Sequence, residues 1–281
     1  MYSAFAPGNV GGESERAIGK WLSSRGGRER VLIATKCGLP MGGAAAASSG
    51  GLSARWIVRA VEDSLQRLQT DYIDLYQAHR DDPAVPLDES LAAFDQLLRA
   101  GKVRAIGASN YSAARLQAAL NVSAARGLAR FETLQPLYNL YDRFDFEGPL
   151  AQLCVSESIS VIPYYSLAAG FLSGKYRSRD DFNQSARGPG MERYLDDRGL
   201  RIVDALWQVA RQRGCKPAQV AIAWLLTRPG VTAPIVSATS LEQLATLSAA
   251  ARMQLAPAEI SLLTHASDRK ASDGDRATAA H

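Results

Sequence analysis

Short apolar runs alternate along this chain with longer segments whose apolar residues recur at helical spacing. The short runs span residues 31–36, 72–78, 103–108, 131–137, 159–165 and 231–236. Their content of β-branched and aromatic residues favours buried strands. The segments between them place apolar residues three and four positions apart, which is typical of helices that bury one face. Strand and helix therefore alternate at about 30-residue intervals, which predicts right-handed βαβ crossovers and a parallel sheet.

Capping residues mark several of the expected helix ends. Ser53 and Ser112 precede apolar helical patterns and are expected N-caps, and Gly101 is expected just past a helix end. Ser240 and Gln243 have the spacing of a capping box. Helices are expected at residues 13–24, 53–68, 87–98, 112–120, 146–158, 200–213, 217–227 and 240–250, with a last helix from Pro257; residues 37–51 and 177–199 are expected surface loops, and 268–281 a disordered tail.

Polar residues stand at or just beyond the carboxyl ends of most expected strands. They are Lys36, His79, Asn110, Gln135 and Ser166. Polar groups supplied by many different strands at one end are typical of a (β/α) barrel, whereas an open sheet concentrates its ligand at one switch point. The chain contains neither a G-x-G-x-x-G motif nor a P-loop. The pattern therefore favours a barrel over an open nucleotide-binding sheet.

For His79 and Lys36, an interpretation without a catalytic role is also possible. His79 fits a catalytic imidazole at a strand end, but an inert strand-capping histidine has the same pattern. Lys36 fits a charged group in a site, or a side chain that extends its stem to bring the ammonium to solvent. The strand pattern alone leaves these alternatives open.

Composition and charge narrow the class of protein. The chain has 281 residues, 47% hydrophobic and 21% charged, which is typical of a globular protein with a large core. The net charge of +4 is scattered along the sequence, which argues against a nucleic-acid-binding surface. Cys37, Cys154 and Cys215 are few and widely spaced, so we expect reduced thiols in a cytoplasmic protein and no metal site. No apolar run reaches the roughly 18 residues of a membrane span.

Seven stretches together resemble the aldo/keto reductase family. They are residues 11–22 (GGESERAIGKWL), 31–38 (VLIATKCG), 68–82 (LQTDYIDLYQAHRDD), 101–110 (GKVRAIGASN), 134–143 (LQPLYNLYDR), 164–176 (YYSLAAGFLSGKY) and 237–244 (SATSLEQL). They follow the family order, and the GGESE form resembles the branch that includes potassium-channel β-subunits and many bacterial reductases. The resemblance implies an α/β fold, a (β/α)8 TIM barrel over residues 1–267, and NADPH-dependent reduction of a small aldehyde or ketone.

The resemblance also implies three catalytic residues. Tyr2 matches the tyrosine that gives a proton to the developing alkoxide, and His79 matches the histidine that positions and polarises the carbonyl. Lys36 matches the lysine that, paired with an aspartate, lowers the pKa of the phenol from its reference of about 10. The aspartate belongs a few residues before Tyr2, where this chain has already begun.

The cofactor residues are carried over from the same resemblance. Three polar residues match those that bind the nicotinamide carboxamide, and Tyr165 matches the aromatic residue on which the nicotinamide stacks, although a packing role for Tyr165 stays open. Thr239 and Leu247 stand where many members have arginine and asparagine, so NADPH rather than NADH is the family default and is not indicated by these residues. The carboxamide set is Ser109, Asn110 and Gln135; the pyrophosphate set is Ser166, Leu167, Ala168, Gly170, Leu172 and Lys175; the adenine-end set is Ser237, Thr239 and Gln243.

The family's first two strands and the helix between them precede Tyr2. We count six strands here, against the eight that closure of this barrel requires. The sequence thus predicts an N-terminally shortened barrel with two exposed sheet edges. Besides an active reductase, the alternatives are a catalytically impaired NADPH-binding protein and a fragment without function.

Overall fold

The computed structural model describes residues 8–41, 50–184 and 188–269. Tyr2 and residues 270–281 of the expected tail lie outside these ranges, as does much of the expected loop at residues 37–51. The chain divides into two compact units. Unit 1 comprises Met1–Gln135 and Ser156–Ser160, and unit 2 comprises Pro136–Val155 and Val161–His281.

Unit 1 is built on a parallel sheet with the strand order β1-β2-β3-β4-β5. The strands are β1 (Ala34–Cys37), β2 (Ile73–Ala78), β3 (Val103–Ser109), β4 (Thr133–Gln135) and β5 (Ser160–Val161, of which Val161 belongs to unit 2). Lys36 pairs with Gln77, and Cys37 with Ala78. Because parallel strands end at the same edge, the polar residues at the carboxyl ends of β1, β2, β3 and β4 share one edge of the sheet. The expected strand–helix alternation is confirmed over this unit.

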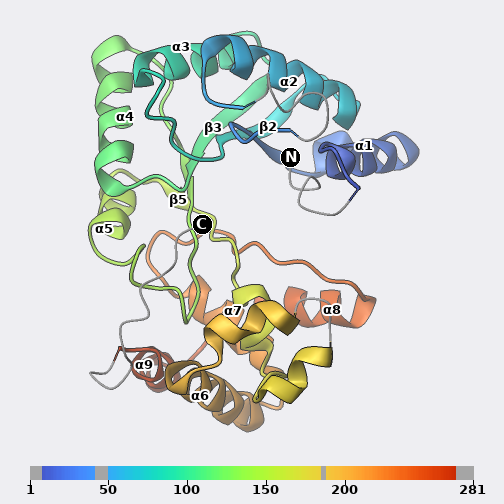
Figure 1. The fold of residues 1–281 in the computed structure, drawn as a ribbon, viewed down its shortest axis with the longest axis vertical. Helices are drawn as coiled ribbons and strands as arrows, with labels where there is room; N and C mark the ends of the chain where they lie inside the picture. Colours follow the sequence, from blue (N-terminus) through green and yellow to red (C-terminus); the bar gives the residue numbers. More distant parts are fainter. Residues whose placement is uncertain (1–7, 42–49, 185–187, 270–281) are drawn as a thin grey trace. The chain divides into compact units, whose positions relative to one another are not determined.

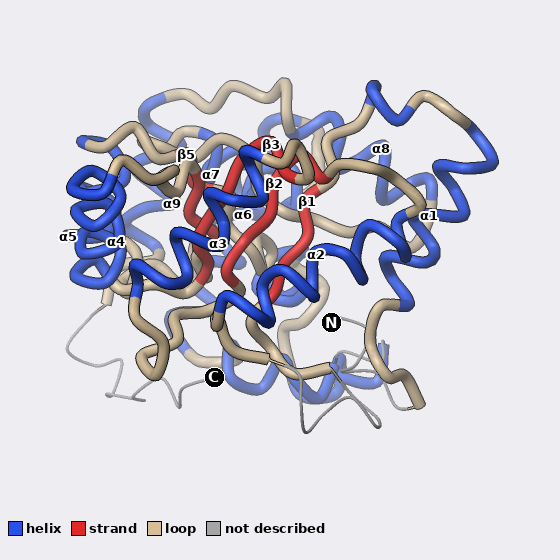
Figure 2. The backbone as a smooth tube through the Cα atoms, turned by 90° about the horizontal axis from the view of Figure 1, so that it is seen from above, coloured by secondary structure: helices blue, strands red, loops and turns tan. Residues whose placement is uncertain are grey.

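The helices of unit 1 are α1 (Glu13–Arg25), α2 (Ala54–Leu68), α3 (Leu87–Arg99) and α4 (Ala113–Arg126), with a short 3-10 helix η2 (Arg28–Arg30). Helices α2 and α3 lie side by side along one face of the strands (Figures 1 and 2). The predicted caps are confirmed: Ser53 accepts from the Trp56 amide, and Ser112 from the Arg115 amide. Gly101 adopts φ 72° just after α3, a conformation that glycine takes without strain.

Asp74 joins three parts of unit 1 at the start of β2. Its buried carboxylate accepts from the Ile33 amide at 2.9 Å, from Arg28 Nη2 at 2.6 Å and from Arg104 Nη1 at 3.2 Å. The Tyr72 ring lies under both guanidinium groups, 3.9 Å from Arg28 and 3.8 Å from Arg104, measured from the guanidinium carbon to the ring centroid. Burial by itself raises the pKa of Asp74, but the Ile33 amide and the Arg28 charge outweigh burial and leave the pKa below its ordinary value.

Replacement Asp74→Asn is expected to lower the free energy of unfolding by about 2 kcal/mol at pH 7, because charge-assisted hydrogen bonds from Arg28 and Ile33 are lost or weakened. A carboxylate with a lowered folded-state pKa stabilises the fold above its unfolded pKa and loses that contribution as pH falls through the folded value. The difference from the wild type should therefore shrink below about pH 4. Urea unfolding at pH 7 and pH 3.5 measures it, with the exposed Asp88→Asn as control. A pH-independent difference would contradict this role.

Unit 2 is mostly helical. Its elements are α5 (Pro149–Ser156, of which Ser156 belongs to unit 1), the 3-10 helices η4 (Ala168–Ser173), η5 (Arg179–Gln184) and η6 (Gly188–Tyr194), and α6 (Asp197–Arg213), α7 (Pro217–Leu226), α8 (Leu241–Ala250) and α9 (Pro257–Ala266). Helix α7 contacts α6 and α8, and it is apolar on nearly every side. Trp224 of α7 is fully buried against the Tyr138 ring. An all-round apolar helix is expected in a core rather than at a surface.

The predicted strand at residues 231–236 is wrong. The described residues of this segment form one isolated parallel bridge, between Val231 and Val161, and no regular strand. Two further backbone bonds reach the same neighbour, from the Thr232 amide to Val161 and from the Ile235 amide to Pro163. The β5 neighbour is short, and Pro163 and Pro234 lack the amide that a ladder needs. The described residues therefore contain five strands rather than six.

The surface loop predicted at residues 177–199 is also wrong in part. It contains η5 and η6, and α6 begins already at Asp197, capped by Asp196. Met191 and Tyr194 are buried, and the Tyr194 ring stacks on Phe171 with centroids 5.6 Å apart. Because most residues of this segment are polar, its sequence gave no sign that Met191 and Tyr194 are buried. The predicted capping box at α8 is half right, because Ser240 accepts from Gln243, but Gln243 Oε1 accepts from Thr239 rather than from Ser240.

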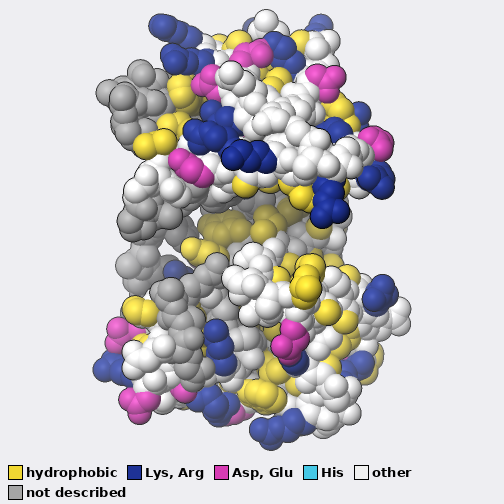
Figure 3. Space-filling view, turned by 90° about the vertical axis from the view of Figure 1, so that its right-hand side faces the viewer, with side chains coloured by type: hydrophobic (Ala, Val, Ile, Leu, Met, Phe, Trp, Pro, Cys, Tyr) yellow, Lys and Arg dark blue, Asp and Glu magenta, His cyan; other side chains and the backbone are white. Residues whose placement is uncertain are grey.

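On the face shown in Figure 3, lysine and arginine side chains alternate with aspartate and glutamate on each unit, without a continuous basic surface. Within the described ranges, no helix has both the length and the apolarity needed to cross a membrane.

Candidate active site

Lys36 and His79 come from the carboxyl ends of neighbouring strands in unit 1. Lys36 lies in β1, His79 directly follows β2, and each side chain is only 8% exposed. The His79 amide donates to the Cys37 carbonyl at 2.8 Å, which ties the two strand ends together. Lys36 and His79 therefore lie on neighbouring strands, although α2 and two connecting segments separate them in the sequence.

Burial sets the protonation of both side chains. It lowers the pKa of Lys36 to about 7. Burial, followed by the charges of Lys36 and Arg80, lowers the pKa of His79 to about 4. His79 is therefore a neutral imidazole at pH 7, with one nitrogen that donates and one that accepts. Strongly shifted pKa values of this kind are frequent at functional sites.

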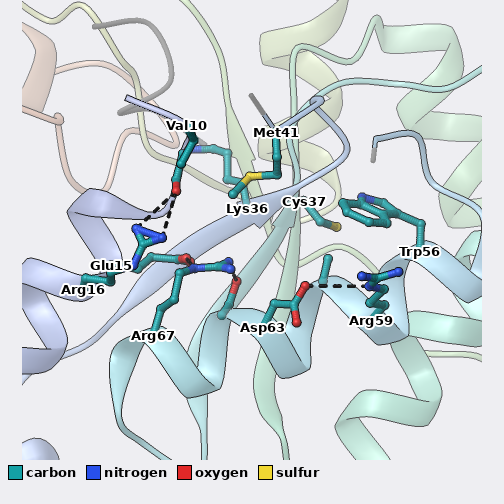
Figure 4. Close-up of a pocket in the computed structure, with 13 residues that line it drawn as sticks. Val10, Glu15, Arg16, Lys36, Cys37, Met41, Trp56, Arg59, Asp63 and Arg67 are labelled. Atoms are coloured by element: carbon teal, nitrogen blue, oxygen red, sulfur yellow. Dashed lines mark hydrogen bonds and ion pairs between the residues drawn. The ribbon is translucent and has the colours of Figure 1, made fainter. Parts of the chain in front are cut away.

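A cavity opens beside Lys36 (Figure 4). Its wall includes Glu15 and Arg16 of α1, and Trp56 and Arg67 of α2. The Glu15 carboxylate accepts from Thr35 Oγ1 at 2.7 Å and from Arg67 Nε at 2.6 Å. Glu15 and Arg67 were not among the residues predicted for the site. The GGESE stretch contains Glu15, but nothing in the sequence indicates which basic residue it meets.

The three predicted carboxamide-binding residues gather around His79. Asn110 Nδ2 donates to the His79 carbonyl at 3.0 Å and to Ser109 Oγ at 3.1 Å, and Ser109 Oγ donates to the Gln135 carbonyl at 2.8 Å. Asn110 adopts φ 56°, a left-handed conformation that asparagine tolerates better than most residues. Unit 1 therefore unites four of the predicted site residues in one hydrogen-bonded cluster at the edge of the sheet.

Tyr165 begins a tightly turned segment in unit 2. It adopts φ 53°, its side chain is 51% exposed, and Ala168, Ala169 and Gly170 also have positive φ. Such conformations are costly for residues other than glycine and cluster at functional sites. A Cβ built on Gly170 would meet no atom within 4 Å, so open space faces the turn there. An exposed aromatic face on a constrained backbone suits a planar ligand.

The residues predicted to bind the pyrophosphate differ in how exposed their side chains are. The Ala168 and Leu172 side chains are fully buried, so only their backbone groups are able to face a ligand. Leu167 packs against the cluster of Ile222 and Leu247, and Ser166 Oγ donates to the Pro163 carbonyl at 3.1 Å. Lys175 is exposed, and its ammonium lies 4.8 Å from the centroid of the Tyr176 ring.

The predicted adenine-end residues lie at the start of α8. Ser237, Thr239 and Gln243 are exposed, and Gln243 Oε1 accepts from the Thr239 amide at 2.9 Å. Partial positive charge at a helix N-terminus suits an anionic group. Leu247 is instead buried in the core with Ile222 and Ala250, which accounts for an apolar residue at that position.

Asn139 is a buried polar residue of unit 2 that was not among the predicted site residues. Its Nδ2 donates to the Tyr165 carbonyl at 3.0 Å and to Asp142 Oδ2 at 2.9 Å. Its Oδ1 accepts from the Tyr141 amide at 2.8 Å and from the Asp142 amide at 2.9 Å. Its place just beyond an expected strand end, in LQPLYNLYDR, was the available signal.

Comparison with known proteins agrees with the resemblance. The model of the aldo/keto reductase family matches residues 5–268. Protein tas of Escherichia coli (strain K12) is 33% identical over 256 residues, 84% of this chain and 74% of the relative. The aldo-keto reductase YhdN of Bacillus subtilis (strain 168) is 34% identical over 247 residues, 86% and 72% respectively. Versiconal hemiacetal acetate reductase of Aspergillus parasiticus is 32% identical over 272 residues, 90% and 78% respectively.

The family model covers nearly all of the chain, and the parallel sheet of unit 1 agrees with the α/β fold of that family. The expected shortening at the N-terminus stays a prediction. The chain belongs to the aldo/keto reductase family, a family of oxidoreductases with a (β/α)8-barrel fold.

Proposed function

We propose that this chain is an NADPH-dependent reductase that converts a small aldehyde or ketone into the alcohol. The observation that carries the proposal is the pair of buried side chains at the ends of β1 and β2, Lys36 and His79, whose pKa values burial lowers to about 7 and about 4. Two titratable groups with shifted pKa values at one edge of a parallel sheet suit acid–base chemistry at neutral pH.

In this proposal the chain's own residues orient the carbonyl and deliver the proton. The neutral His79 donates an N–H to the carbonyl oxygen and so polarises it. Tyr2, which lies outside the described residues, gives its phenolic proton to the same oxygen. The ammonium form of Lys36 favours the phenolate and lowers the pKa of the phenol. Bound NADPH supplies the hydride that the carbonyl carbon accepts.

Each unit by itself contains residues that suit a part of a dinucleotide. Ser109, Asn110 and Gln135 offer amide and hydroxyl groups to a carboxamide, and the exposed Tyr165 ring offers a stacking face. The turn of Ser166, Leu167, Ala168, Gly170 and Leu172, with Lys175, suits a pyrophosphate by its backbone amides and its charge. Ser237, Thr239 and Gln243 stand at a helix N-terminus suited to a 2′-phosphate.

Titration with NADPH, followed by turnover of a generic aromatic aldehyde, tests the proposal. We expect saturable binding, a dissociation constant about tenfold lower for NADPH than for NADH, and consumption of NADPH only with aldehyde present. Binding without turnover would support the alternative of a catalytically impaired cofactor-binding protein. Absence of binding by a chain that is folded by circular dichroism would contradict the proposal.

Two further properties belong to the same proposal. We propose a single barrel domain over residues 1–267, with substrate selectivity in residues 37–51 and 177–199, because connecting segments commonly carry specificity. We also propose a cytoplasmic location, which is supported by the free thiols of Cys37, Cys154 and Cys215.

A further inference from the structure

The peptide carbonyl of Tyr165 is held by two donors from different parts of unit 2. Asn139 Nδ2 donates to it at 3.0 Å, and the Ala168 amide at 2.6 Å. Tyr165 itself adopts φ 53°, a left-handed conformation that is unfavourable for a non-glycine residue. A strained residue persists only when its surroundings hold it. Asn139 is the side chain that does so.

The orientation of the Asn139 amide is fixed by its neighbours. Its oxygen faces two amide donors, Tyr141 and Asp142, and its nitrogen faces two acceptors, the Tyr165 carbonyl and the Asp142 carboxylate. A flipped amide would oppose donor to donor and acceptor to acceptor at all four contacts. Asn139 is fully buried, so water does not compensate for a lost contact.

The Asp142 carboxylate, which accepts from Asn139, is itself held by two further donors. Asp142 accepts from the Tyr194 hydroxyl at 3.1 Å and from Arg193 Nη2 at 3.1 Å. Both donors belong to η6. The hydrogen bonds therefore run from η6 through Asp142 and Asn139 to the backbone of Tyr165.

We propose that Asn139 is a positioning residue that sets the direction of the Tyr165 ring for stacking on the nicotinamide of the cofactor. This rests on the proposed function, in which Tyr165 is the stacking residue. The ring is half exposed and makes an edge contact with Tyr164, at a centroid distance of 5.4 Å. Its direction follows from the Cα–Cβ bond of Tyr165, which turns with the peptide that Asn139 holds.

The replacement Asn139→Ser separates positioning from support of the turn. A serine hydroxyl accepts from backbone amides two and three residues on, as the asparagine oxygen does here, so the turn is retained. The serine side chain is too short to reach the Tyr165 carbonyl. The control is Tyr138→Phe, which removes the hydrogen bond from the Tyr138 hydroxyl to Glu147 and leaves the contact between Asn139 and Tyr165 in place.

The full chain is titrated separately with the two halves of the cofactor, reduced nicotinamide mononucleotide and 2′-phospho-ADP-ribose. For Asn139→Ser we expect the dissociation constant of the nicotinamide half to rise about tenfold, equivalent to about 1.4 kcal/mol, and that of the adenosine half to stay within about twofold. Tyr138→Phe should leave both constants within about twofold of the wild type. Binding of the adenosine half also shows that each variant is folded.

Two results would overturn the inference while the proposed function stands. One is unchanged affinity of Asn139→Ser for the nicotinamide half. The other is equal weakening of both halves, which would indicate a structural role only. If the wild type binds neither half nor NADPH, the proposed function fails, and the inference falls with it.

Discussion

Replacement of Lys36 with methionine is expected to abolish carbonyl reduction and, at the same time, to stabilise the protein. A methionine retains the volume of the lysine stem but removes the charge that, in the proposed mechanism, favours the phenolate. We therefore expect kcat/KM to fall by about 10³-fold, within the range for loss of acid–base or electrostatic catalysis. Burial holds the pKa of Lys36 at about 7 rather than at its ordinary value near 10.5. Its charge is therefore unfavourable in the folded state.

The sign of the stability effect follows from proton linkage. Between pH 7 and pH 10.5 the unfolded chain binds more protons at Lys36 than the folded chain does, so stability rises with pH in this window. The cost of burying Lys36 is fully present below pH 7 and disappears above pH 10.5. Lys36→Met should thus raise the free energy of unfolding by about 5 kcal/mol at pH 6 and by much less at pH 10.

Urea unfolding at pH 6 and pH 10, together with aldehyde turnover, measures both effects on one variant. The matched control is Lys20→Met, in which an exposed lysine of α1 is removed. It should change neither activity nor stability beyond about 0.5 kcal/mol. Undiminished turnover by Lys36→Met would refute the assignment of Lys36, and loss of stability at pH 6 would refute the account of its burial.

Replacement of Arg143 with methionine is expected to have the largest effect on the stability of unit 2. The buried guanidinium donates to Glu147 through Nη2 at 2.8 Å and through Nε at 3.1 Å, and to the Thr264 carbonyl at 3.0 Å. It also contacts Ser267 Oγ and the Asp268 carboxylate. Arg143 thereby satisfies carbonyl and polar groups at the C-terminal end of α9, where helices leave acceptors unpaired.

Arg143→Met leaves the half-buried Glu147 carboxylate without its nearest cation. Burial by itself raises the pKa of Glu147, and the hydrogen bonds from Arg143 and Tyr138 outweigh it and lower the pKa. Removing one partner of a buried ion pair typically costs about 3–5 kcal/mol, and because Tyr138 still donates to Glu147 we expect about 3 kcal/mol here. The amides of α9 should also lose protection against hydrogen exchange before those of α7 do.

Denaturant unfolding and hydrogen exchange of Arg143→Met are compared with those of Arg179→Met. Arg179 pairs with Glu192 at 2.7 Å, and both side chains are mostly exposed. Exposed pairs contribute little, so the control should lose less than about 1 kcal/mol. Equal losses in the two variants would show that the Arg143 network does not support α9.

Much of unit 1 follows from local chemistry. Strands β2 and β3 begin and end within one or two residues of their expected limits. Ser53 and Ser112 cap the starts of α2 and α4, and Gly101 follows the end of α3, as expected. Capping, helical periodicity and strand composition act over a few residues, so a single sequence reveals them. The motifs shared with a known family add the placement of Lys36 and His79 on neighbouring strands.

The sequence alone therefore determined the family, the alternation of strands and helices, and the candidate residues of unit 1. Tertiary structure decided what depends on partners distant in the chain. Residues 231–236 do not form a strand because the neighbouring strand β5 is short and prolines interrupt the ladder. Residues 177–199 form ordered 3-10 helices in which the Tyr194 ring packs on Phe171. Likewise Asn139 holds Tyr165, and Arg67 pairs with Glu15, only because folding unites groups far apart in sequence. Such pairings depend on long-range packing, which local composition does not encode.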